Sequence, residues 1–108
     1  MSNEPLSEQF RLVAKQWVDA DEAASLMEET KTAVFSEMMG KVIEENISMP
    51  VNKAEIAVKS SPEYKEFVTQ MVSLRSKANL LKVKLDYIKM RFQEQMSGEA
   101  SKRAEMRL

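Results

Sequence analysis

Apolar residues recur every three or four positions over two long stretches of this chain, and this spacing limits the fold more than any other feature. Such spacing places the apolar side chains along one stripe of an α-helix, where they can pack against a second helix. The first stripe consists of Phe10, Val13, Trp17, Ala20, Ala24, Met27, Lys31, Val34 and Met38. The second consists of Phe67, Met71, Leu74, Ala78, Leu81, Leu85, Ile88 and Phe92. The sequence therefore predicts two long helices of similar length, with Lys31 as a polar interruption of the first stripe.

Residues that disfavour helix are concentrated between these stretches. The segment "NISMPVNK" carries Pro50 and two asparagines, and it predicts a loop. Capping-box spacings at residues 19–25 leave a break there open, but we expect the first helix to be continuous or gently bent. The expected elements of one helical domain, 1–108, are a long helix over about 6–45, a connector over 46–61 with a short helix at 53–59, a second long helix over 62–96 and a basic tail over 97–108.

Local signals place the boundaries of these elements. Asn52, with Glu55 three residues later, has the spacing of a capping box and is expected to open the short helix. Either Ser60 or Ser61 can cap the second long helix, because the proline that follows them fits a first turn. Gly98 is expected to end or loosen that helix. The remainder, "EASKRAEMRL", can form a short helix or a frayed tail, and it is expected to be poorly ordered unless a partner holds it.

Two long helices joined by a short connector predict an all-α, antiparallel, coiled-coil-like hairpin. A pair of helices buries only one narrow stripe of each, and this chain carries further apolar residues outside the stripes. These residues are Val18, Leu26, Phe35, Met39, Val68, Val72, Leu80, Val83, Tyr87 and Met90. Because they widen the apolar face, we expect the hairpins to self-associate into a helical-bundle oligomer, a dimer or larger.

The charges are divided between the two halves of the chain. Residues 1–58 hold eleven acids and five bases, whereas residues 59–108 hold six acids and eleven bases. In an antiparallel hairpin, the heptad e positions of the two helices face each other. This arrangement predicts that Glu28 lies near Arg75 and Asp21 near Lys82, with Lys89 in the same basic row.

A second basic row, consisting of Lys77, Lys84 and Arg91, has no matching acids within that pairing. It can be a solvated flank of the helix, or it can meet the acids of another subunit. It can also contact nucleic-acid phosphates, supplemented by cations of the tail, although the sequence pI of about 5.6 is low for such a module. The tail cations are Lys102, Arg103 and Arg107. A membrane partner is not expected, because the hairpin uses the apolar face of this helix.

The composition argues against catalysis and against a cofactor. The chain has no cysteine and no histidine, and it carries neither a glycine-rich phosphate loop nor a nucleophile elbow. Its acidic clusters lack the spacing of an EF-hand, so no metal site is expected. No apolar stretch approaches the roughly 20 residues that span a bilayer, and the start "MSNEPLSEQF" lacks the pattern of a secretory signal. We therefore expect a cytoplasmic protein that is not an enzyme.

The second half of the chain resembles small helical proteins encoded in bacteriophage and prophage genomes. The resemblance covers roughly the last 50 residues and rests on "SPEYKE", "KANLLKVKLDYIKMRF" and the ending "RAEMRL". It implies a protein of the host cytoplasm that is an accessory to DNA metabolism or to assembly. It implies no activity and no functional residues.

Overall fold

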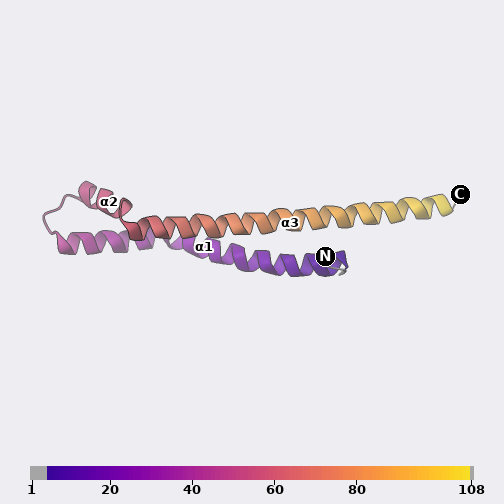
Figure 1. Cartoon of the computed structure of the whole chain (residues 1–108), viewed down its shortest axis with the longest axis horizontal. Coiled ribbons are helices and arrows are strands. Elements are labelled where there is room, and N and C mark those ends of the chain that lie inside the picture. Colours follow the sequence, from indigo (N-terminus) through magenta and orange to yellow (C-terminus); the bar gives the residue numbers. More distant parts are fainter. Residues whose placement is uncertain (1–4, 108) are drawn as a thin grey trace. The chain divides into compact units, whose positions relative to one another are not determined.

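The computed structural model describes residues 5–107, and in that range it contains three α-helices and no β-strand (Figure 1). They are α1 (Leu6–Glu45), α2 (Val51–Lys59) and α3 (Pro62–Met106). The long helices α1 and α3 pack against each other, and the short helix α2 lies between them in the chain. The predicted all-α helical hairpin is therefore confirmed. Of the predicted domain, residues 1–4 and Leu108, the last residue of the tail, lie outside the described residues.

Helix α1 has the predicted bounds and is continuous through residues 19–25. It also passes through Gly40, where an added Cβ would meet no heavy atom within 4 Å. The helix ends at Glu45, and the amide of Asn46 still donates to the carbonyl of Val42 (3.0 Å). The loop begins where the asparagines and the proline of "NISMP" begin.

Helix α2 begins at Val51, two residues earlier than expected, and the predicted capping box at Asn52 is wrong. The N-cap residue is Pro50, whose extended backbone (φ −60°, ψ 147°) suits the position before a helix. Its carbonyl accepts hydrogen bonds from the amides of Lys53 (3.1 Å) and Ala54 (3.0 Å). Asn52 therefore lies inside the first turn, where its Oδ1 accepts only the neighbouring amide of Lys53 (3.0 Å).

The start of α3 follows the capping rule that the sequence indicates. Ser61 Oγ accepts a hydrogen bond from the amide of Tyr64 (3.2 Å), and Pro62 occupies the first helical position. The same hydroxyl donates to the carbonyl of Val58 at the end of α2 (2.6 Å). One serine side chain therefore connects the last turn of α2 to the first turn of α3.

The end of α3 corrects the prediction of a tail over 97–108. The helix continues through Gly98 to Met106. Gly98 costs a helix about 1 kcal/mol relative to alanine, but strong helix formers follow it in "EASKRAEM". An added Cβ at Gly98 would meet nothing within 4 Å, so the backbone there is ordinary helix. The glycine penalty alone does not end this helix.

The contacts of the chain divide into two compact units. The first unit joins α1 up to Ala20 with α3 from Lys77 onward. Its core consists of Val13, Leu85 and Ile88, which are 5–7% exposed. The half-buried residues that pack on this core are Ala14, Trp17 and Leu81.

The second unit comprises residues 21–76 and contains all of α2. Ala54 and Val58 of α2 are fully buried, so this short helix covers part of the unit with one face. The rings of Phe35 and Tyr64 meet edge to face, with their centroids 5.7 Å apart. These contacts hold α1, α2 and the start of α3 together within the unit.

The apolar stripes that the spacing predicts are the packed faces of α1 and α3. Every stripe residue except Phe10 (37% exposed) and Phe92 (44% exposed) is buried or half-buried. Lys31 is half-buried, as expected for a polar residue within the first stripe. The prediction that the two apolar stripes form the packed faces is therefore confirmed along both helices.

Two leucines of α3 provide a matched test of this packing. Leu85 is 7% exposed and Leu80 is 72% exposed. We expect Leu85→Ala to lower the free energy of unfolding by about 2–5 kcal/mol, because it leaves a cavity in the core. Leu80→Ala should change it by less than about 0.5 kcal/mol. Chemical denaturation of dilute protein measures both values, and similar losses for the two variants would contradict the described packing.

Candidate functional site

Arg75 of α3 forms the most extensive polar contact between the long helices. Its Nη1 donates to Asp21 Oδ1 (2.7 Å), and its Nε donates to Glu28 Oε2 (2.9 Å). Its Nη2 donates to Glu28 Oε1 (2.7 Å) and to Ser25 Oγ (3.2 Å). The three acceptor residues share one face of α1, since they are spaced by four and three positions. The planar guanidinium can therefore bind two carboxylates and a hydroxyl at once.

The Arg75 contacts change the charge pairing that the heptad pattern predicts. Glu28 pairs with Arg75 as expected, but Asp21 also pairs with Arg75 rather than with Lys82. The Nζ of Lys82 lies 5.1 Å from the ring centroid of Trp17 and 3.5 Å from Asp86 Oδ1. The register of α3 along α1 differs from the expected one by half a heptad. Arg75 therefore lies level with the midpoint between Asp21 and Glu28.

The hydrogen bonds of this cluster affect protonation. Those from Arg75 lower the pKa of the Glu28 carboxyl below its usual 4.5. The bonds to Glu28 and Asp21 raise the pKa of Arg75. The Arg75–Glu28 ion pair therefore stays charged at neutral pH.

The residues of the second basic row are all exposed along α3. Within residues 5–107, Lys77, Lys84 and Arg91 form no ion pair. Because α3 remains helical to Met106, Lys102 lies on the same side of the helix, about three turns beyond Arg91. Arg103 projects from a different side of α3, about 100° away. The helix therefore extends the row by one residue of the predicted tail.

Arg107 lies outside that row, since it follows the last residue of α3 in a turn. Its amide donates to the carbonyl of Ala104 (3.3 Å), and its side chain is exposed. The tail cations therefore do not form one patch.

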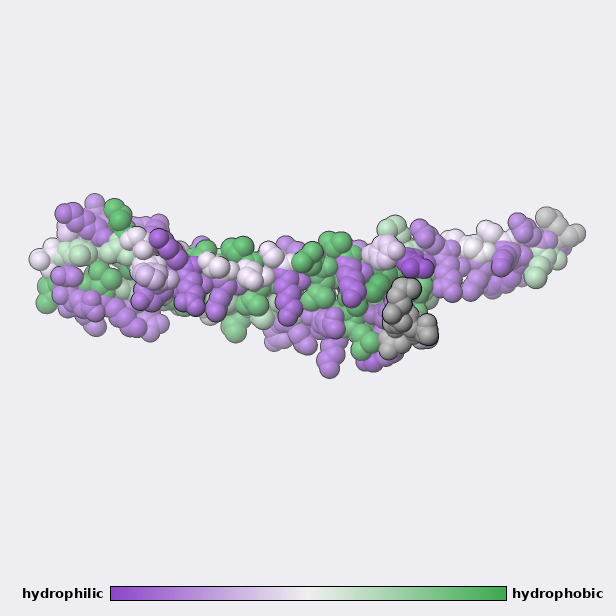
Figure 2. Space-filling model, viewed as in Figure 1, coloured by the Kyte–Doolittle hydropathy of each residue, from purple (hydrophilic) through white to green (hydrophobic). Residues whose placement is uncertain are grey.

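An exposed apolar stripe runs along α3 on the side opposite its packed face. It consists of Leu80, Val83, Tyr87 and Met90, and we call it the outer stripe. Its four side chains are 72%, 66%, 55% and 53% exposed, respectively. They are spaced by three, four and three positions, so they share one side of the helix. Figure 2 shows that apolar surface alternates with hydrophilic surface along the visible face of the protein.

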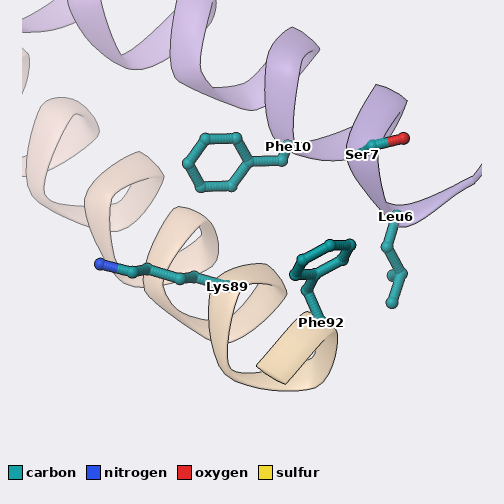
Figure 3. A pocket seen from close by; sticks show the side chains of 5 residues that line it. All are labelled: Leu6, Ser7, Phe10, Lys89 and Phe92. Carbon is teal, nitrogen blue, oxygen red and sulfur yellow. The ribbon is translucent and has the colours of Figure 1, made fainter. Parts of the chain in front are cut away.

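A small pocket opens where the packed faces of the first unit end (Figure 3). It has a volume of about 250 Å³ and is almost entirely apolar. Its walls are Leu6, Ser7, Phe10, Lys89 and Phe92. The two phenylalanines were predicted as seam residues, and their partial exposure produces the pocket. Lys89, which was predicted to take part in hairpin charge pairing, instead lies along its wall and forms no ion pair among the described residues.

Metal clusters and membrane-spanning helices are both absent from residues 5–107. No group of three or more carboxylates there could hold a metal ion. In the same residues, no helix is long and apolar enough to cross a membrane.

Comparison with known proteins found no matching family model, no matching curated protein and no matching solved structure. The resemblance of the second half to phage-encoded helical proteins stays a prediction.

The Arg75 cluster can be tested with two Arg→Lys variants. Arg75→Lys keeps the charge but loses the planar fork, whereas Arg91→Lys makes the same change where no described ion pair exists. We expect Arg75→Lys to lower the melting temperature more than Arg91→Lys at pH 7. Equal shifts for the two variants would show that the cluster does not stabilise the hairpin.

The pH dependence has a defined sign. The folded-state pKa of Glu28 lies below its unfolded value of 4.5, so the stabilisation is fully present above pH 4.5. It is lost below that pH, as the pH falls through the folded-state pKa. Thermal unfolding between neutral pH and about pH 3 should therefore show the difference between the two variants shrinking below pH 4.5. A difference that persists under acid conditions would contradict the role of Glu28.

Proposed function

We propose that this protein is a non-enzymatic accessory protein that acts as a self-associating helical scaffold. The observation that carries the proposal is the outer stripe of α3. A helix at the surface of a monomer normally presents polar residues to water on the side away from its core. Helix α3 instead has apolar residues on two opposite sides, and α1 covers only one of them.

The spacing and exposure of the outer stripe support a helical partner. Leu80, Val83, Tyr87 and Met90 lie within eleven residues, the first and last of which are about 15 Å apart at the α-helical rise. Each of them is more than half exposed. Contiguous apolar surface of this kind is typical of protein interaction sites. A helix packed along the stripe would remove it from water.

The basic row limits which surface can cover the stripe. Lys77, Lys84 and Arg91 follow one border of it, at positions that face each other when two such helices pack antiparallel. Two copies of α3 packed antiparallel through their stripes would therefore repel each other. Exposed acids that form no ion pair within residues 5–107 occur on the outer side of α1. They are Asp19, Glu22, Glu29 and Glu37. Opposite charge thus supports a contact between α3 of one copy and α1 of another.

The cellular setting of the scaffold is a further part of the proposal. The resemblance of the second half to phage and prophage helical proteins supports a phage-type accessory protein in the host cytoplasm. A role as an assembling accessory needs no catalytic group, and the proposal assigns none.

A matched pair of valines tests the scaffold proposal. Val83 in the outer stripe and Val51 in α2 are both 66% exposed. We expect the unaltered protein to sediment as a dimer or larger species at micromolar concentration, and Val83→Glu to shift it toward monomer. Val51→Glu should leave the sedimentation coefficient unchanged, and circular dichroism should show the same helicity for all three proteins. Monomeric behaviour of the unaltered protein would refute the proposal.

Nucleic-acid binding is the second candidate function. It is favoured by the unpaired basic row, which the continuous α3 extends to Lys102. Cations on one side of a helix, two to three turns apart, are arranged to meet successive phosphates.

Salt dependence tests this second candidate. We expect binding to single- or double-stranded DNA to weaken steeply between about 50 and 200 mM salt. The variant Lys77→Gln/Lys84→Gln/Arg91→Gln should lower the slope of log affinity against log salt by about 3. The control, with the same loss of charge elsewhere, is Lys15→Gln/Lys41→Gln/Lys53→Gln. Absence of binding at low salt, or equal effects of the two triple variants, would eliminate this candidate.

A further inference from the structure

Helix α3 extends past the beginning of α1 within their common unit (Figure 1). Leu6, the first residue of α1, lines pockets together with Phe92 and Gln95. Every described residue from 89 to 107 is exposed. We call residues 93–106 the overhang. Its 14 residues span about 21 Å at the α-helical rise.

Within residues 5–107, no helix covers the packed side of α3 where it continues into the overhang. Met96, Glu99, Arg103 and Met106 are spaced by three, four and three positions. At 100° per residue they lie on the same side of the helix as Ile88 and the rest of the seam. Met96 is 49% exposed and Met106 is 86% exposed. This side of the overhang therefore carries apolar residues at its two ends and two opposite charges at its centre.

The two central charges are not paired within the described part of the chain. Glu99 and Arg103 are four residues apart, a spacing that allows an ion pair along one helix. Neither of them forms an ion pair with another residue of the range 5–107. Both are therefore available to a partner.

We infer that the overhang binds the overhang of a second copy in the antiparallel direction. With a two-fold axis at the level of Ser101, Met96 lies opposite Met106 of the second copy. Glu99 then lies opposite Arg103 of the second copy, and symmetry repeats both contacts. Antiparallel helix pairs form layers of this kind, in which each seam position meets the other seam position of its partner. The charges and apolar residues of this face are therefore complementary to those of the same face in an antiparallel second copy.

Charge distinguishes this arrangement from the parallel one. Two parallel overhangs would bring Glu99 against Glu99 and Arg103 against Arg103 at the centre of the contact. In the antiparallel pair, both central contacts would instead join Glu99 to Arg103, and a Met–Met contact would lie at each end. Methionine side chains adapt well to such small contacts.

The contact is small, and this has a structural consequence. Two paired segments of 14 residues lie at the low end of protein interface sizes. This inference rests on the proposed self-association, because the overhang contact adds to the contact through the outer stripe. Copies joined both side by side and tail to tail form extended assemblies rather than a closed dimer.

Disulfide trapping tests the direction of the pair, because the protein contains no cysteine of its own. We expect a mixture of Met96→Cys and Met106→Cys proteins to oxidise to a disulfide-linked heterodimer. Met96→Cys alone should not trap, because the two introduced cysteines would lie about 15 Å apart in the antiparallel pair. Efficient trapping of Met96→Cys alone would indicate a parallel contact and overturn the inference.

Charge reversal tests the central layers in the same trapping assay. Adding Glu99→Arg to both cysteine proteins should lower heterodimer formation several-fold, because both central pairs become repulsive. Placing Glu99→Arg on one protein and Arg103→Glu on the other should restore it. If the yield of the disulfide-linked heterodimer does not depend on these charges, trapping results from random collision, and the inference is overturned.

Sedimentation of the unaltered protein separates this inference from the scaffold proposal. If the protein is oligomeric but the mixture does not trap, the overhang contact is wrong and the scaffold proposal stands. If the protein is monomeric and nothing traps, both are wrong.

Discussion

Two helices packed against each other bury only one narrow stripe of each, and most features of this protein follow from that constraint. The core of the first unit consists of Val13, Leu85 and Ile88 with a few half-buried neighbours. The second unit adds α2, which covers part of it with Ala54 and Val58. Such an arrangement buries little apolar surface. Each polar contact therefore contributes more to the stability of the fold, and the exposed apolar groups are more important as interaction surfaces.

The position of α3 along α1 is specified by charge as well as by apolar packing. A heptad seam alone permits several registers, because a shift by three or four residues still brings apolar side chains together. The guanidinium of Arg75 binds Asp21, Ser25 and Glu28 together, which a shifted register would prevent. In the first unit the corresponding register places Lys82 over Trp17, so its alkyl chain and charge lie against an indole ring rather than an acid.

The sequence predicts most of the architecture, because periodicity and capping report local physics. The two stripes, the bounds of α1 and the cap at Ser61 all depend on neighbours within a few residues. The half-heptad register could not be predicted in this way. The heptad pattern treats each cation as facing one anion, whereas an arginine fork can bind two.

The beginning of α2 and the end of α3 were also predicted incorrectly, for a related reason. The helix formers that follow Gly98 outweigh its penalty, and the extended backbone of Pro50 makes that residue the N-cap in place of Asn52. The pocket near Phe92 was missed because periodicity shows which residues share a stripe, but not where the covering helix begins.

Helix α3 is longer than the partner that covers it, and this difference connects the fold to the proposed assembly. Along the covered part, the partner that we propose for the outer stripe carries acids at its border, because two basic rows packed antiparallel would repel each other. Beyond the level of Leu6, the side of α3 that continues its packed face carries Glu99 and Arg103. There, a second copy of α3 in the antiparallel direction would place an opposite charge against each of them. In the proposed assembly, the two surfaces of α3 would therefore select different partners, because each would form like-charge pairs with the wrong one.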